Sequence, residues 1–201
     1  YFIKTDVINS KEALEIKRDN ILVTAKSGSA NLVDKILTLN KTILTTSNKD
    51  KISGDKLQAN LLKNEFRFEG NIEGTLYSFS QEELKGIKEM DYSNPIKFKG
   101  DFTRAFFIEN GSKQYVVTRN EIINSSEFTY KDMKLQGDFI EIENSSQKIF
   151  AKGNSKMLLN SGNKISAESI TVDMLKEITN LKNNVTITNN TGAVGGINTR
   201  A

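Results

Sequence analysis

The chain repeats one degenerate pattern about every 30 residues along most of its length. The clearest copy covers residues 52–72, and further copies, none of which needs an internal gap, begin at residues 23, 135 and 165. Self-similarity at such a period indicates a repeated supersecondary unit, which buries its apolar face only against its neighbours. We therefore expect a fold built by stacking these units, each about two strands and two chain reversals.

Within each copy, apolar residues occupy every second position, as in Phe66, Phe68, Gly70 and Ile72. This alternation is typical of half-buried β-strands, and strands commonly run for about five or six residues. Clusters rich in Asn, Ser and Gly separate the strands and favour turns, because Asn and Gly tolerate left-handed backbone geometry. The clearest clusters are 60–64, 144–147 and 160–163.

Three segments depart from the regular copies. Residues 97–124 fit a fifth, poorer copy, in which Asn110–Gly111 predicts a tight turn. Residues 80–91 predict a short helix, because Ser80 and Glu83 have capping-box spacing and Pro95 follows. That helix would either cover part of the sheet or dock a partner. Residues 191–201 lack periodicity and predict a flexible tail, which leaves 1–190 as a single domain.

The expected fold is all-β: an elongated, twisted antiparallel jelly roll, or folded-over sheet, with about five two-strand repeats of roughly 30 residues. A parallel β-helix fits less well, since its coils are usually shorter. The inward set mixes large side chains such as Phe68 with small ones such as Ala59 and Ala151. This mixture allows either a closed core or a slot for an apolar ligand.

Composition narrows the function classes. The 201 residues include no Cys, His or Trp, which excludes thiolate metal sites, disulfides and a Ser-His-Asp triad. The net charge is +3 with interspersed signs, and the basic residues form no stripe for nucleic acid. The chain has no apolar run long enough to span a membrane and begins with Tyr1, which is compatible with a processed, exported protein.

The sequence favours a protein that is not an enzyme, without metal or other cofactor. Asp55 and Asp138 recur at matching positions of different repeats. A catalytic carboxylate pair would be unique, whereas a structural turn residue recurs with its repeat. We therefore expect structural roles for both.

The repeat resembles the OstA-like repeat of the periplasmic lipopolysaccharide-transport (Lpt) proteins of the LptA and LptC type. In that family the alternating strand runs into a Gly-Asn-Val element. This sequence places Gly70-Asn71-Ile72 and Asn183-Asn184-Val185 there, with degenerate forms at 153–155 and 41–43. The resemblance covers residues 14–190, with the segment at 80–95 and the poorer copy after it as departures.

The resemblance implies a periplasmic protein, soluble or tethered to the inner membrane by an N-terminal segment absent here. Such a protein holds the lipid A acyl chains of lipopolysaccharide in an apolar groove and passes the lipid from inner to outer membrane. The implied partners are other Lpt jelly rolls, joined by end-to-end strand pairing, and the inner-membrane ABC transporter complex. The residues that we expect to line the groove are Leu37, Leu39, Phe66, Phe68, Ile72, Ile140, Ile142, Ile149 and Val172. The alternative is a structural or adhesive β-repeat protein with a closed core and no ligand.

Overall fold

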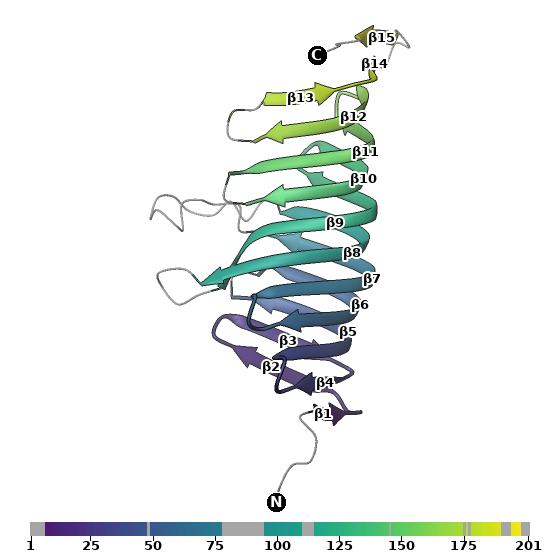
Figure 1. Ribbon diagram of the computed structural model, residues 1–201. Coiled ribbons are helices and arrows are strands. Elements are labelled where there is room, and N and C mark those ends of the chain that lie inside the picture. Colours follow the sequence, from purple (N-terminus) through teal and green to yellow (C-terminus); the bar gives the residue numbers. More distant parts are fainter. Residues whose placement is uncertain are drawn as a thin grey trace, which may run out of the picture.

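The computed structural model is a single folded-over antiparallel sheet that rises from the N-terminus to the C-terminus (Figure 1). It describes residues 7–47, 49–77, 95–109, 115–144, 146–174, 176, 178–189 and 194–197. In these ranges every regular element is a strand. The all-β, antiparallel prediction is confirmed. The helix expected at 80–91 and the turn expected at Asn110–Gly111 lie outside the described residues.

The sheet has 15 strands. The strands are β1 (Val7–Ser10), β2 (Leu14–Arg18), β3 (Ile21–Ala25), β4 (Ser27–Asn31), β5 (Ile36–Thr46), β6 (Lys51–Asn60), β7 (Glu65–Leu76), β8 (Ile96–Glu109), β9 (Tyr115–Tyr130), β10 (Met133–Glu143), β11 (Lys148–Leu159), β12 (Lys164–Asp173), β13 (Ile178–Lys182), β14 (Val185–Thr188) and β15 (Val194–Ile197). From β4 to β12 neighbours along the chain are neighbours in the sheet. At its two ends β1 pairs with β4, β3 pairs with β2 and β5, and β12 pairs with both β13 and β14.

Each strand from β5 to β12 bends near its middle, and the bends follow one another up the right-hand side of Figure 1. The ladder shifts register at several bends, and pairs of left-handed residues mark them, as at Gly70–Asn71, Asn124–Ser125 and Gly153–Asn154. Such bulges bend a strand without ending its pairing. The strands are therefore 10 to 16 residues long, and the expected five or six residues correspond to one half of each strand.

The bends divide the sheet into two arms that face each other. Arm 1 contains β1, β4, β13 and the half-strands 36–40, 56–60, 65–69, 102–109, 115–123, 139–143, 148–152 and 169–173. Arm 2 contains β2, β3, β14, β15 and the half-strands 42–46, 51–53, 72–76, 96–99, 126–130, 133–136, 155–159 and 164–167. Residues 194–197 lie in the segment 191–201, which we expected to be a flexible tail; they form β15 and pair with β14.

The free ends of the arms form two rims. Rim 1 ends arm 1 and carries the turns at 32–35, 61–64 and 144–147, whereas rim 2 ends arm 2 and carries those at 19–20, 131–132 and 160–163. All three Asn-rich clusters predicted to be reversals are turns. Within the described residues the chain passes from one arm to the other only at the bends, so the two rims are separate edges. We call the line along which they face each other the slit.

A repeated carboxylate–amide contact crosses neighbouring strands at the bends. Asn71 Nδ2 donates to Asp55 at 2.6 Å, and Asn154 Nδ2 donates to Asp138 at 3.0 Å. Asn183 donates in the same way to Glu168 at 2.9 Å. Each Asn is in the left-handed conformation, which Asn tolerates better than most residues. These contacts agree with structural roles for Asp55 and Asp138.

The contacts of Asp55 at its bend make the free energy of unfolding depend on pH. Hydrogen bonds from Lys41 (2.5 Å) and Asn71 hold the pKa of Asp55 below its ordinary value. A lowered folded-state pKa stabilises the protein above the unfolded pKa of about 4, and this contribution is lost as the pH falls through the folded pKa. We therefore expect the urea midpoints of wild type and Asp55→Asn to differ more at pH 6 than at pH 3. Asp132→Asn, in the β9–β10 turn, is the control, and an equal pH profile for both variants would contradict this account.

Candidate functional site

The interior between the arms is the candidate site, and it contains all nine residues predicted to line a groove. Five of them occupy one cross-strand row on the inner face of arm 1: Leu37, Phe66, Ile142, Ile149 and Val172. Leu39, Phe68 and Ile140 occupy the next row, and Ile72 lies across the bend on arm 2. Leu37 is half-buried and the other eight are buried.

Sequence reasoning missed much of the facing wall. Phe98, Phe128 and Met157 are buried on the inner face of arm 2, in the same row as Leu135. Phe98 lies in the poorer repeat copy and Phe128 follows it, and neither was predicted to line the groove. Their own alternation, Phe98 with Gly100 and Phe128 with Tyr130, was the available signal. The buried residues of both arms form one apolar cluster.

Polar side chains interrupt the apolar interior at two neighbouring positions. Thr103 and Asn120 are both fully buried, and Thr103 Oγ1 lies 2.8 Å from Asn120 Oδ1 and 2.8 Å from the Glu121 carbonyl. Within the described residues Asn120 Nδ2 has no hydrogen-bond partner. Thr103 Oγ1 contacts only one of the two terminal atoms of the Asn120 amide. If the amide is turned by 180°, its oxygen and nitrogen exchange places, and the other atom is then the one without a partner.

Three residues connect the two arms across the slit. Asn20, in the β2–β3 turn, accepts a hydrogen bond from Tyr115 N at 2.7 Å and donates to Tyr115 O at 2.9 Å. The Arg18 guanidinium donates to the Tyr115 hydroxyl and lies 4.6 Å from the ring centroid. We call Arg18, Asn20 and Tyr115 the latch. It joins arm 2 near the N-terminus to the start of β9 in arm 1.

A charged cluster lies on the outer face of arm 1. Glu121 is nearly buried between Arg104 (2.5 Å) and Arg119 (3.3 Å), and it lies opposite Glu141 on the next strand. Burial, above all, raises the pKa of Glu141. Two carboxylates in different environments are the chemistry that acid–base catalysis needs. Here, however, they lie on the face of a sheet, and neither of the pockets described next includes them.

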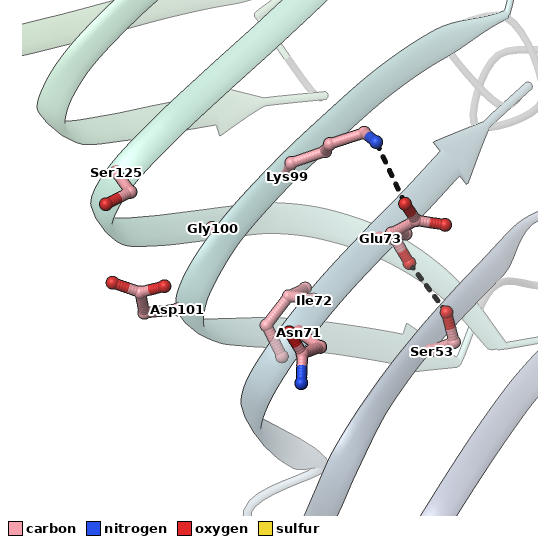
Figure 2. A pocket seen from close by; sticks show the side chains of 8 residues that line it. All are labelled: Ser53, Asn71, Ile72, Glu73, Lys99, Gly100, Asp101 and Ser125. Carbon is pink, nitrogen blue, oxygen red and sulfur yellow. Dashed lines mark hydrogen bonds and ion pairs between the residues drawn. The ribbon is translucent and has the colours of Figure 1, made fainter.

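Figure 2 shows a pocket of about 490 Å³ at the bends of β6 to β9. Lys99 donates to Glu73 at 2.9 Å and holds the pKa of Glu73 below its ordinary value. Asp101 occupies the place that Asp55 and Asp138 have at their bends, but the next strand offers the shorter Ser125 instead of Asn. The pocket therefore marks a gap in the row of carboxylate–amide contacts.

A second pocket, of about 460 Å³, lies on arm 2 across β10, β11, β12 and β14. Its lining includes Lys134, Lys156, Lys164 and the partly exposed Leu158. Of the nine predicted groove residues, only Ile72 lines either pocket. The described residues contain no cluster of three metal-ligating side chains, and no helix among them is long and apolar enough to cross a membrane.

A similar solved structure is that of LptH from Pseudomonas aeruginosa. LptH is described as the LptA homologous periplasmic component of the conserved lipopolysaccharide transport device. The two chains are 11% identical, the match covers 90% of this chain and 96% of LptH, and the TM-score is 0.31. No family model matches the sequence, and none of the curated proteins matches it.

Proposed function

We propose that this protein is a periplasmic lipopolysaccharide-transport component that holds lipid acyl chains between its two arms and passes the lipid from inner to outer membrane. The observation that carries the proposal is the apolar interior, a single cluster that extends from Ile21 on β3 to Val185 on β14 past the buried polar pair Thr103 and Asn120. In the described chain, the arms enclosing it are joined covalently only at the bends. The OstA-like repeat of the sequence supports the same function.

The physical role of such an interior is to keep hydrocarbon away from water. Each exposed CH₂ group of an acyl chain costs about 0.8 kcal/mol, so a lipid with several chains does not cross an aqueous space unaided. A long apolar channel lowers that cost at every step along its axis. The nine predicted residues, from Leu37 to Val172, would contact the chains directly, and no chemical change in the lipid is needed.

The proposed partners follow from the ends of the sheet. The two ends, at β1 and β2 and at β13 and β15, present backbone groups that no neighbouring strand pairs in the described chain. Such edges add strands from other molecules readily. We propose that they join other Lpt jelly rolls end to end, with an inner-membrane ABC transporter complex as the source of the lipid. The protein would be soluble or tethered to the inner membrane.

A second candidate is a structural or adhesive repeat protein whose core is closed. It is favoured by the burial of eight of the nine predicted lining residues and by the latch across the slit. The two functions share the fold and differ in one property, since only the carrier opens its arms to amphiphiles.

Site-specific photo-crosslinking separates these functions. A photoreactive amino acid at Phe68, which points into the interior, is expected to crosslink to purified lipopolysaccharide. The same group at Arg67, on the outer face of the same strand and paired with Glu65 at 2.7 Å, is expected to give no product. Crosslinked protein is detected in gel electrophoresis as a band of lower mobility that also contains lipopolysaccharide.

Two further outcomes decide the matter. Leu37, the half-buried member of the lining set, should crosslink at least as well as Phe68 if chains enter through the slit. No crosslink at Phe68 or Leu37, from protein that retains the wild-type circular dichroism spectrum, would reject the carrier. Equal crosslinking at Arg67 would indicate adsorption on the surface.

A further inference from the structure

Two turns of rim 1 are built in the same way and raise an apolar side chain at their tips. Asn31 Oδ1 accepts hydrogen bonds from the backbone N–H groups of Val33 and Asp34, both at 3.0 Å. Asn60 Oδ1 accepts from Leu62 and Lys63 at 3.1 and 3.0 Å. Val33 is 64% exposed and Leu62 is 73% exposed. These Asx turns hold both tips outward.

The two tips belong to one continuous edge. Leu61 N donates to the carbonyl of Lys35 at 3.0 Å, which joins the first turn to the second. Phe107 N donates to the carbonyl of Asn64 at 3.0 Å, and this joins the second turn to the end of β8. Ile108, the next residue on β8, is 41% exposed. Rim 1 therefore presents apolar side chains on successive, hydrogen-bonded segments.

Rim 2 differs from rim 1. Its turns at 19–20, 131–132 and 160–163 contain only Asp, Asn, Lys, Ser and Gly. None of the exposed large hydrophobic residues in the described chain belongs to these turns, whereas Leu32, Val33, Leu62 and Ile108 belong to rim 1. The part of rim 1 from Leu32 to Ile108 is thus apolar, while the rim 1 turn at 144–147 and the described turns of rim 2 are polar. The molecule therefore has a preferred site for contact with an apolar phase.

Lysines accompany the apolar tips. Lys35 follows Val33 by two residues and Lys63 follows Leu62 directly, and both are exposed. Neither lysine has an ion pair within the described residues, while the nearby Asp34 carboxylate accepts a hydrogen bond from Asn31 at 2.7 Å. Apolar groups that insert shallowly, together with basic groups at the level of phosphates, bind anionic bilayers.

We propose that rim 1 docks on an anionic lipid bilayer, with Val33, Leu62 and Ile108 inserted among the lipids and Lys35 and Lys63 at the headgroup phosphates. A bilayer fits this edge better than a partner protein because protruding tips enter it without matching hollows. The proposal stands whether or not the interior takes an acyl ligand. It would also place one border of the slit at the membrane surface.

Vesicle flotation tests the proposal with the whole chain. Wild type is expected to float with vesicles of phosphatidylethanolamine and phosphatidylglycerol and to stay behind with phosphatidylcholine alone. The double variant Val33→Asp, Leu62→Asp should lose about tenfold or more of the binding, because it removes both inserted groups. Leu158→Asp, at a 40% exposed leucine on the outer face of arm 2, is the matched control and should bind like wild type.

Charge and depth provide independent readouts. Lys35→Glu with Lys63→Glu should weaken flotation, and added salt should weaken wild type in the same way. The chain has no cysteine, so Leu62→Cys and Leu158→Cys can each carry an environment-sensitive dye. We expect a blue shift on vesicle addition at position 62 only.

Three results would overturn the proposal. They are no flotation of wild type, equal flotation of the Val33/Leu62 double variant, and a blue shift at position 158 that matches position 62. Concentration-dependent dimers that the double variant abolishes, without vesicle binding by wild type, would instead make rim 1 an interface between two copies. Thermal unfolding of each variant shows that a loss of binding is not a loss of fold.

Discussion

Replacement of Gly74 by Ala is expected to destabilise the protein by about 3 kcal/mol, the upper end of the usual range for overpacking a core. A Cβ atom at Gly74 would lie 1.9 Å from Phe98 Cζ and 2.1 Å from Phe98 Cε1. Phe98 is itself 2% exposed, and its cross-strand neighbour on the other side is the fully buried Phe128. The ring can therefore move away from the new Cβ atom only by displacing the buried residues around it. The drop is measured as a lower urea midpoint at an unchanged m-value.

A matched glycine and a second-site change control this prediction. Gly137 also lies on the inner face, but a Cβ there would meet its nearest atoms at 3.3 to 3.4 Å, so Gly137→Ala should be much milder. Phe98→Leu shortens the obstructing side chain and should recover part of the loss when combined with Gly74→Ala. Strict additivity of the two changes would mean that the Gly74–Phe98 contact is not the cause.

The inner face was predictable because alternation needs no knowledge of distant contacts. Once it is known whether the odd or the even positions of a strand face inward, its buried side is known. The alignment of the four copies transfers this assignment from one copy to the others. Leu39, Phe66 and Ile142 therefore lie inside, as expected. Phe98 and Phe128 were missed where the repeat is degenerate, although their own alternation marks the same buried face.

The bends were not predictable in the same way. Gly70–Asn71 and Asn60–Asn64 each contain an Asn in the left-handed conformation, but the first bends a strand and the second reverses the chain. Left-handed residues allow both results, and the choice depends on whether the neighbouring strand continues its ladder. The latch was harder still to predict, since Asn20 and Tyr115 are 95 residues apart in the sequence and Asn20 lies outside the repeat copies.

The closed interior also has a physical reason that the sequence could not decide. Apolar surface left open to water costs about 25 cal/mol per Å², so two facing apolar walls without a ligand close on each other. A carrier and a structural protein therefore look alike when empty. They differ in the free energy needed to separate the two arms. The hydrogen bonds of the latch contribute the polar part of that free energy.

Tyr115→Ala is expected to part the arms and to destabilise the protein by about 3–5 kcal/mol, as large-to-small changes at buried aromatic residues do. Tyr115 is 5% exposed, and the change removes its ring from the core and its contacts with Arg18. If the slit is the route for acyl chains, this variant should show faster lipopolysaccharide crosslinking at Phe68 in conditions where it is still folded. Tyr115→Phe keeps the ring and should change crosslinking only slightly.

Faster crosslinking supports a lipid entrance at the slit only if it is not caused by the general loss of stability. Leu135→Ala empties a fully buried position on β10, away from the latch, and should destabilise by about 2–5 kcal/mol without opening the slit. Asn20→Ala removes both hydrogen bonds to the Tyr115 backbone and should raise access like Tyr115→Ala at a smaller loss of stability, about 1–3 kcal/mol. Faster crosslinking in the two latch variants but not in Leu135→Ala would identify the slit as the entrance. A rate that follows stability in all three variants would mean that lipid reaches Phe68 only through general loosening of the fold, and the latch would then be a structural contact alone.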